Sequence, residues 1–525
     1  MNHPVSHHYV ARVIKSTFAM VTVLCLCANL TAQTQNSASD NLLLEGEKPL
    51  SQCVPFDMPD VQTLRQSQHQ VFAHYFVPFP ISIDNKPADK DQYVKHIMNP
   101  NGFGKRYVKH GGKTRQRPLP RPVRSDDNWL LEDMKLEVAR GINLGLDGFI
   151  TDIVSDSGIN WKRFLAVMQA ADQVDPGFKI VIMAGMPALF QNPAKDQSPQ
   201  RMAEMFLTLA AYPSACRTDD GRLVISAFRA NDKSVSWWRE VFAIMADKGE
   251  SVYFVPLIQP WWDDAGKWEV QLKAFLPISE GISTWGPRWA SAAQQWQNFP
   301  STVAQYNKIS MSPVGAQDMR AKSAIYWEAN NTQSYRKLWE AAILGKANWV
   351  QLITWNDYSE ATEICPSSGT QFSLYDLTAY YVTWFKQGKA PTITRDVIYY
   401  SHRIHSINAT PDPHRQPKLF KNLAPDQACD EIECLVFAKA PAMLTIKLQD
   451  TVQTFDIHTG LNEVRIPLQT GTPQFTLKRN DQVVAQVTSA FEIDNNITYQ
   501  NLLYHGGSSS RPVIGQTTKP TVKQK

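Results

Sequence analysis

The stretch TWNDYSEATE holds the residues of this 525-residue chain whose types and spacing best suit catalysis. Asp357 and Glu360 stand three residues apart, directly after an apolar run and beside aromatic side chains. Cleavage of a glycosidic bond normally requires two carboxyl groups, one protonated and one ionised. The pair therefore fits that chemistry, although a turn or cap at Asp357 beside a solvated Glu360 explains the spacing equally well.

A third candidate carboxylate is Asp152, which lies near the end of the apolar run DGFITDI. Catalytic groups of a barrel of parallel strands lie at the carboxyl ends of the strands, so we favour Asp152 over Asp147 at the start of this run. At the start of a strand, a turn or capping role is the better explanation of an aspartate.

Aromatic and polar side chains near these acids could bind sugar rings, because an indole offers a flat apolar face and a polar edge. The alternative for the loop residues is that they only cover the surface of the loop. The alternative for His74 is a core histidine whose hydrogen bonds are satisfied within the protein. Arg288 either orients a carboxylate or forms a surface ion pair. The residues that we expect to contact substrate are His74, Gln259, Trp261, Trp262, Asp263, Trp285, Trp327, Glu328, Trp355, Asn356 and Tyr358.

The elements that must position these residues alternate between short β-branched runs and longer amphipathic stretches, which is typical of βα units. Eight such alternations predict a (β/α)8 TIM barrel. A doubly wound open sheet is the alternative, but no Gly-rich dinucleotide fingerprint follows any run. The eight predicted strands are VFAHYFV (71–77), DGFITDI (147–153), KIVIMAG (179–185), RLVISAF (222–228), SVYFVPL (251–257), GISTW (281–285), KISMSPV (308–314) and WVQLITW (349–355).

The remaining sequence divides into segments of different character. After Pro391 the runs alternate apolar and polar residues, which predicts an antiparallel β-sandwich that packs on the barrel rather than binding sugar. Cations, an apolar run and small residues at the start predict a signal peptide, hence a secreted or periplasmic protein. The expected organisation is a signal peptide (1–32), a linker or arm (33–65), the barrel (66–390), the sandwich (391–505) and a disordered tail (506–525).

Composition excludes several classes of function. A net charge of +4 is slight for this length and does not suggest nucleic-acid binding. No later segment is apolar enough for a membrane anchor. Of the five cysteines left after signal cleavage, Cys429 and Cys434 are the best candidates for a disulfide, and their spacing matches no zinc site. We expect a monomer without a metal.

Four of these stretches together resemble glycoside hydrolase family 71, the α-1,3-glucanases: AHYF, GLDGF, MSPVG and above all ITWNDYSE. The resemblance extends from about residue 71 to 364. It implies a barrel with an attached sandwich, a polysaccharide substrate, no metal or organic cofactor, and inverting, endo-acting hydrolysis of α-1,3-glucan. It also places Asp357 and Glu360 on matching positions of the family.

One departure from the family keeps two alternatives open. The family tends to carry an acid near the sixth strand, where this chain reads STWGPRWA. A catalytically inactive glycan-binding barrel would explain its loss. An endo-α-mannosidase-like hydrolase would share the exterior of the barrel but make different sugar contacts.

Overall fold

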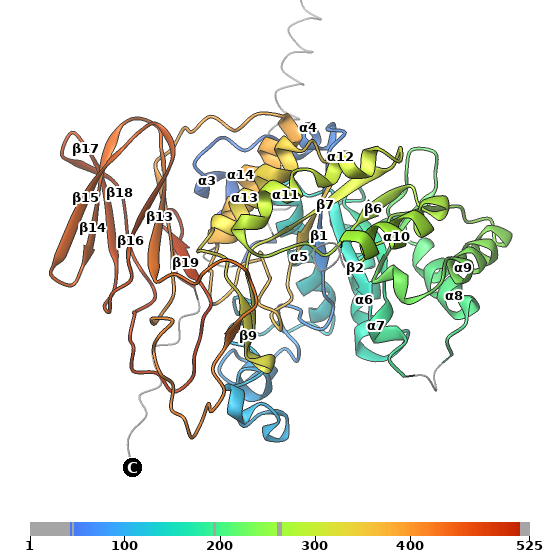
Figure 1. Cartoon of the computed structure of the whole chain (residues 1–525), viewed down its shortest axis with the longest axis horizontal. Coiled ribbons are helices and arrows are strands. Elements are labelled where there is room, and N and C mark those ends of the chain that lie inside the picture. The colour runs from blue at the N-terminus through green and yellow to red at the C-terminus, as the bar shows by residue number, and fades with distance from the viewer. Residues whose placement is uncertain (1–41, 45–46, 193–195, 260–264, 515–525) are drawn as a thin grey trace, which may run out of the picture.

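The computed structural model describes residues 42–44, 47–192, 196–259 and 265–514, and Figure 1 shows their arrangement. A β/α barrel forms one side of the molecule and a two-sheet β region forms the other. Within the described residues, no helix combines the length and the apolar character needed to span a membrane. The predicted signal peptide lies outside the described residues.

Eight parallel strands form the barrel, in the order β5-β4-β3-β2-β1-β10-β7-β6. The two ends of this sheet meet, because Leu257 just after β5 forms a parallel bridge with Ser283 of β6. All eight predicted strands are present, so the predicted barrel is confirmed. The strands are β1 (Gln70–Tyr75), β2 (Gly148–Ile153), β3 (Lys179–Gly185), β4 (Leu223–Phe228), β5 (Val252–Phe254), β6 (Gly281–Ser283), β7 (Ile309–Gly315) and β10 (Trp349–Ile353).

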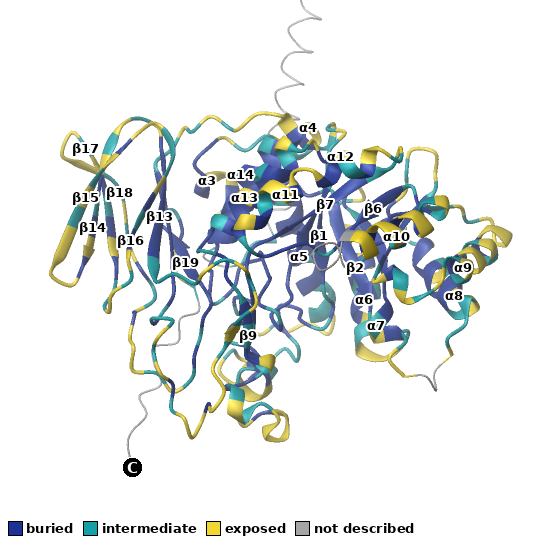
Figure 2. Ribbon diagram, in the orientation of Figure 1, coloured by how far each residue is buried: buried dark blue, intermediate teal, exposed yellow. Residues whose placement is uncertain are grey.

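Amphipathic helices lie between the strands and bury one face against them, so that the barrel strands are dark in Figure 2. Ser198 and Ser234 accept hydrogen bonds from backbone N–H groups of the helices that follow them. The helices of the barrel are α5 (Trp129–Asn143), α6 (Gly158–Val174), α7 (Met186–Leu189), α8 (Pro199–Ala210), α9 (Val235–Asp247), α10 (Ala265–Phe275), α11 (Ala293–Trp296), α12 (Phe299–Ala304), α13 (Gln333–Leu344) and α14 (Ser373–Gln387).

The described part of the predicted linker or arm (33–65) is an arm that packs on the barrel. It forms the short helices α3 (Leu50–Cys53) and α4 (Val61–Arg65). Phe56 between them is buried and packs edge-on against Tyr380 of α14 at 5.9 Å. The sequence concealed this packing because the apolar residues that anchor the segment follow no helical or strand period.

Two four-stranded antiparallel sheets follow the barrel and form the predicted sandwich. Tyr400 stacks on Phe475 between the sheets at a ring distance of 5.6 Å, and Phe437 packs against Tyr380 of the barrel. The first sheet therefore lies between the barrel and the second sheet. The strands are β11 (Val397–His402), β13 (Glu431–Ala438), β16 (Gly460–Pro467) and β19 (His505–Ser508) in one sheet, and β14 (Ala442–Leu448), β15 (Thr451–Ile457), β17 (Gln474–Arg479) and β18 (Gln482–Thr488) in the other.

Two further expectations for this part of the chain are wrong. Residues 506–514 are not the disordered tail predicted there, because β19 pairs with β11 and Arg511 forms a buried ion pair with Asp376 at 2.7 Å. The rest of the predicted tail, 515–525, lies outside the described residues. Cys429 and Cys434 are not bridged. The Cys434 side chain packs inside the sandwich, whereas the Cys429 Sγ lies 3.3 Å from Asn330 at its edge.

Candidate active site

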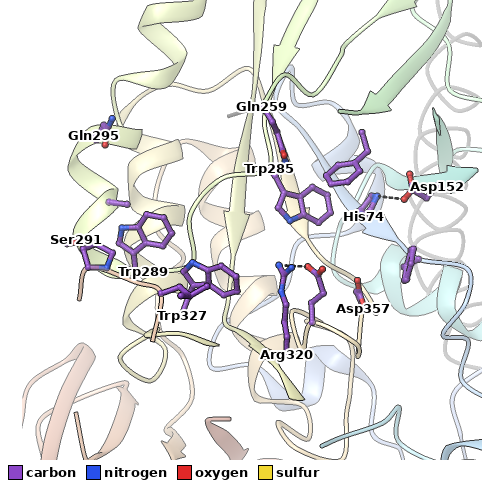
Figure 3. A pocket seen from close by; sticks show the side chains of 16 residues that line it. His74, Asp152, Gln259, Trp285, Trp289, Ser291, Gln295, Arg320, Trp327 and Asp357 are labelled. Carbon is purple, nitrogen blue, oxygen red and sulfur yellow. Dashed lines mark hydrogen bonds and ion pairs between the residues drawn. The ribbon is translucent and has the colours of Figure 1, made fainter. Parts of the chain in front are cut away.

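A cavity of about 840 Å³ opens at the carboxyl ends of the barrel strands, where βα barrels carry their catalytic groups. Its walls combine carboxyl groups, one guanidinium and several aromatic rings (Figure 3). The lining residues are His74, Phe76, Asp152, Phe228, Gln259, Trp285, Trp289, Ser291, Ala292, Gln295, Arg320, Trp327, Asp357, Glu360, Leu423 and Pro425.

Asp357 and Glu360 reach this cavity from one tight turn that follows β10. The Asp357 carbonyl accepts backbone hydrogen bonds from Glu360, at 3.3 Å, and from Thr362, at 3.2 Å. One carboxylate oxygen of Asp357 also accepts hydrogen bonds from the Ser359 backbone N–H, at 2.9 Å, and from the Ser359 hydroxyl, at 2.8 Å. The turn therefore fixes both acids at the cavity wall.

A chain of charged groups holds the Glu360 carboxyl. Arg320 donates to it at 2.8 Å and is itself held by two hydrogen bonds to Asp318, of 2.8 and 2.7 Å. Burial raises the pKa of Glu360 to about 7; Arg320 opposes this rise, while the carboxylates of Asp357 and Asp318 add to it. A carboxyl with such a pKa is still partly protonated near neutral pH, as a general acid must be.

His74 and Asp152 form a second polar pair in the cavity, at the ends of β1 and β2. Both are more than nine-tenths buried, and His74 Nε2 lies 3.8 Å from an Asp152 oxygen. Within the described part of the chain, neither ring nitrogen of His74 has a hydrogen-bond partner, and Asp152 Oδ1 has none either. Trp285 packs edge-on over His74 at 4.9 Å. Buried polar atoms without partners at a cavity wall suit a ligand rich in hydroxyl groups.

Comparison with known proteins identifies the family of this chain. A family model described as "Glycosyl hydrolase family 71" matches residues 123–511. The chain belongs to this family.

Curated relatives and solved structures show similarity over most of the chain. The glucan endo-1,3-alpha-glucosidase agn1 of Schizosaccharomyces pombe is 24% identical over 400 residues, which cover 70% of this chain and 89% of that protein. The ascus wall endo-1,3-alpha-glucanase of the same yeast is 23% identical and covers 68% and 88%. A solved GH99 endo-alpha-mannosidase from Bacteroides thetaiotaomicron, 16% identical, covers 61% of this chain and 98% of that one, with a TM-score of 0.46.

Seven of the candidate residues line the cavity of this family 71 protein. Another three, Trp261, Trp262 and Asp263, lie outside the described residues. The seven are Asp152, Asp357, Glu360, His74, Gln259, Trp285 and Trp327.

The four other candidates lie away from the cavity, which corrects their expected contact with substrate. Trp355 is fully buried and donates from its indole N–H to Glu137 at 2.6 Å. The Asn356 side chain is bound to the backbone of the loop after β1. The Tyr358 hydroxyl contacts the Cys365 sulfur at 3.0 Å in the core. Glu328 pairs with Arg403 at 2.7 Å between barrel and sandwich.

Arg288 lies behind the cavity wall, and several cavity residues that the sequence did not single out complete the site. Arg288 is buried beside Asp318, at 3.5 Å, and so does not form a surface ion pair. Nothing in the sequence pointed to Arg320 as a site residue, because it lies on the short strand β8 (Asp318–Arg320), outside any periodic pattern. Trp289 could have been found as the second tryptophan of STWGPRWA. Among the described residues, no cluster of three or more His, Cys, Asp or Glu side chains is placed to hold a metal ion.

Proposed function

We propose that this family 71 protein is an exported, endo-acting hydrolase of α-1,3-glucan that inverts the anomeric centre. The observation that carries the proposal is the pair Asp357 and Glu360 on the wall of one barrel cavity. The two yeast relatives, both named as endo-1,3-α-glucanases, support α-1,3-glucan as substrate. The signal-like residues 1–32 support export.

In the proposed reaction, Glu360 is the general acid and Asp357 the general base. Water attacks the anomeric carbon while Asp357 accepts one of its protons. The bond from that carbon to the glycosidic oxygen breaks, and Glu360 donates its proton to the departing oxygen. The raised pKa of Glu360 supports its assignment as the acid, since burial, with a further contribution from Asp357 and Asp318, disfavours a negative charge there.

Asp152 has two possible places in this scheme. Its pairing with His74 and its unpartnered oxygen favour hydrogen bonding to hydroxyls of the sugar that is attacked. If Asp152 acted as the base instead, Asp152→Asn would cause the loss of rate expected for a general base, and Asp357→Asn would lose less. An inactive glycan-binding barrel would have lost a necessary acid, whereas Asp357 and Glu360 both line the cavity, which weighs against that alternative.

The proposal is tested with the protein that begins after Ala32, incubated with insoluble α-1,3-glucan, α-mannan and a β-1,3-glucan. Release of reducing sugar is measured for the wild type, for Glu360→Gln and for Glu204→Gln, a matched change at an exposed residue of α8. We expect release from α-1,3-glucan alone, abolished only in Glu360→Gln. Release from α-mannan would favour the mannosidase alternative, and no release from any substrate would overturn the proposal.

A further inference from the structure

The cavity has two ends of different character (Figure 3). At one end, the buried pair His74 and Asp152 lies beside Trp285. At the other end the side chains are half-buried or exposed, so the cavity is open there. This outer wall consists of Trp289, Ser291, Gln295, Trp327, Leu423 and Pro425.

Part of the outer wall comes from the chain beyond the barrel. Strand β12 (Lys421–Asn422), which follows β11, returns to the barrel mouth and pairs with β9 (Ile325–Trp327). The Leu423 N–H donates to the Tyr326 carbonyl at 2.8 Å. These bonds hold Leu423 beside Trp327 at the cavity.

A second set of contacts fixes the same segment to the loop after β6. The Ser291 N–H donates to an Asp426 carboxylate oxygen at 3.0 Å, and the Ser291 hydroxyl donates to the other oxygen. The Asn422 side chain donates to the Asp426 carbonyl at 2.8 Å. The outer wall is therefore built by barrel and C-terminal residues bonded to one another, and Leu423 remains 40% exposed on it.

Arg320 shows on which side of the acids this wall lies. Its guanidinium donates to Glu360 at 2.8 Å and lies 4.8 Å from the centroid of the Trp327 ring. In Figure 3, Arg320 lies between Trp327 and Asp357. The proposed acid is thus next to the outer wall, and the departing sugar, which takes the proton of Glu360, must lie on that side.

We propose that the outer wall binds the leaving-group portion of the α-glucan chain, so that the C-terminal region takes part in substrate binding as well as packing. This inference rests on the proposed function. The half-buried indoles of Trp289 and Trp327 offer apolar faces to the C–H groups of sugar rings, and Leu423 and Pro425 extend that surface. Ser291 and Gln295 carry groups able to hydrogen-bond sugar hydroxyls.

The test compares α-1,3-glucan with a 4-nitrophenyl α-1,3-glucooligosaccharide, on which only release of 4-nitrophenol is followed, so that the leaving group is not a sugar. The variants are Trp289→Ala and Leu423→Ala, with Leu419→Ala as the matched control, an exposed leucine of the same segment that does not line the cavity. For each, kcat/KM is measured on both substrates, after circular dichroism has verified folding.

For Trp289→Ala, we expect the loss of kcat/KM on the glucan to exceed the loss on the aryl substrate by about tenfold. For Leu423→Ala, the difference should be about threefold. Both losses should arise mainly from a higher KM. The Leu419→Ala control should match the wild type on both substrates. Equal losses on the two substrates, or no loss in either variant, would overturn the inference while leaving the proposed function intact. A wild type inactive on both substrates would overturn the proposed function, and the inference with it.

Discussion

The turn after β10 presents one face to the cavity and the other to the protein interior, and two of its glutamates show the difference. Glu360 lines the cavity and is held by Arg320. Glu363, three residues later, is fully buried. Burial raises the pKa of Glu360 to about 7 and that of Glu363 to about 8. A raised pKa alone therefore does not mark a catalytic acid, because the carboxyl must also reach the substrate.

The largest expected effect comes from removing either acid on the cavity face. Asp357→Asn and Glu360→Gln should each lower kcat on α-1,3-glucan by about 10² to 10⁴, the usual contribution of a general acid or base. Their thermal unfolding should stay close to that of the wild type. A loss of less than about tenfold in either variant would remove that residue from the mechanism.

On the interior face, Glu363→Gln should change stability instead of chemistry. The pKa of Glu363 is raised on folding, so its ionisation destabilises the folded state progressively as pH rises from about 4.5 to about 8. The variant should equal the wild type in stability near pH 4.5. At pH 8 it should be more stable by an amount on the order of a few kcal/mol. Urea unfolding across this pH range measures the difference, and a variant less stable at pH 8 would contradict the assignment.

Trp355→Phe tests the same face by a smaller change. The variant loses the indole hydrogen bond to buried Glu137, which should lower its free energy of unfolding by about 1 to 3 kcal/mol. Activity per folded molecule should not change, because Trp355 does not line the cavity. A selective loss of kcat without loss of stability would show that Trp355 acts in catalysis and contradict its structural role.

The smallest expected effect is a displacement of the pH profile in Arg320→Gln. Arg320 lowers the pKa of Glu360, so its neutral replacement should raise that pKa. In the wild type, kcat should fall as pH rises through about 7 and Glu360 loses its proton. In the variant this fall should occur at higher pH, whereas Arg320→Lys, which keeps the charge, should stay nearer the wild type. A shift to lower pH would contradict the role of Arg320.

The sequence predicted the barrel well, because each strand is a short run of β-branched residues between amphipathic helices. It could not separate the two faces of the turn after β10, since Asp357, Glu360 and Glu363 share one spacing. Which side chains of this turn are buried depends on contacts with residues distant in the sequence, such as that of Trp355 with Glu137. Arg320 and Leu423 reach the site from segments without a periodic pattern, and only the folded chain shows them.

The anomeric configuration of the first product tests the central claim, that Asp357 and Glu360 carry out a single displacement. Proton NMR would follow cleavage of an α-1,3-glucooligosaccharide from the first turnovers, before mutarotation mixes the anomers. With Asp357 as base and Glu360 as acid, the β-anomer must appear first. Initial release of the α-anomer would mean double displacement through a covalent intermediate, and would contradict the assignment of Asp357 as the base.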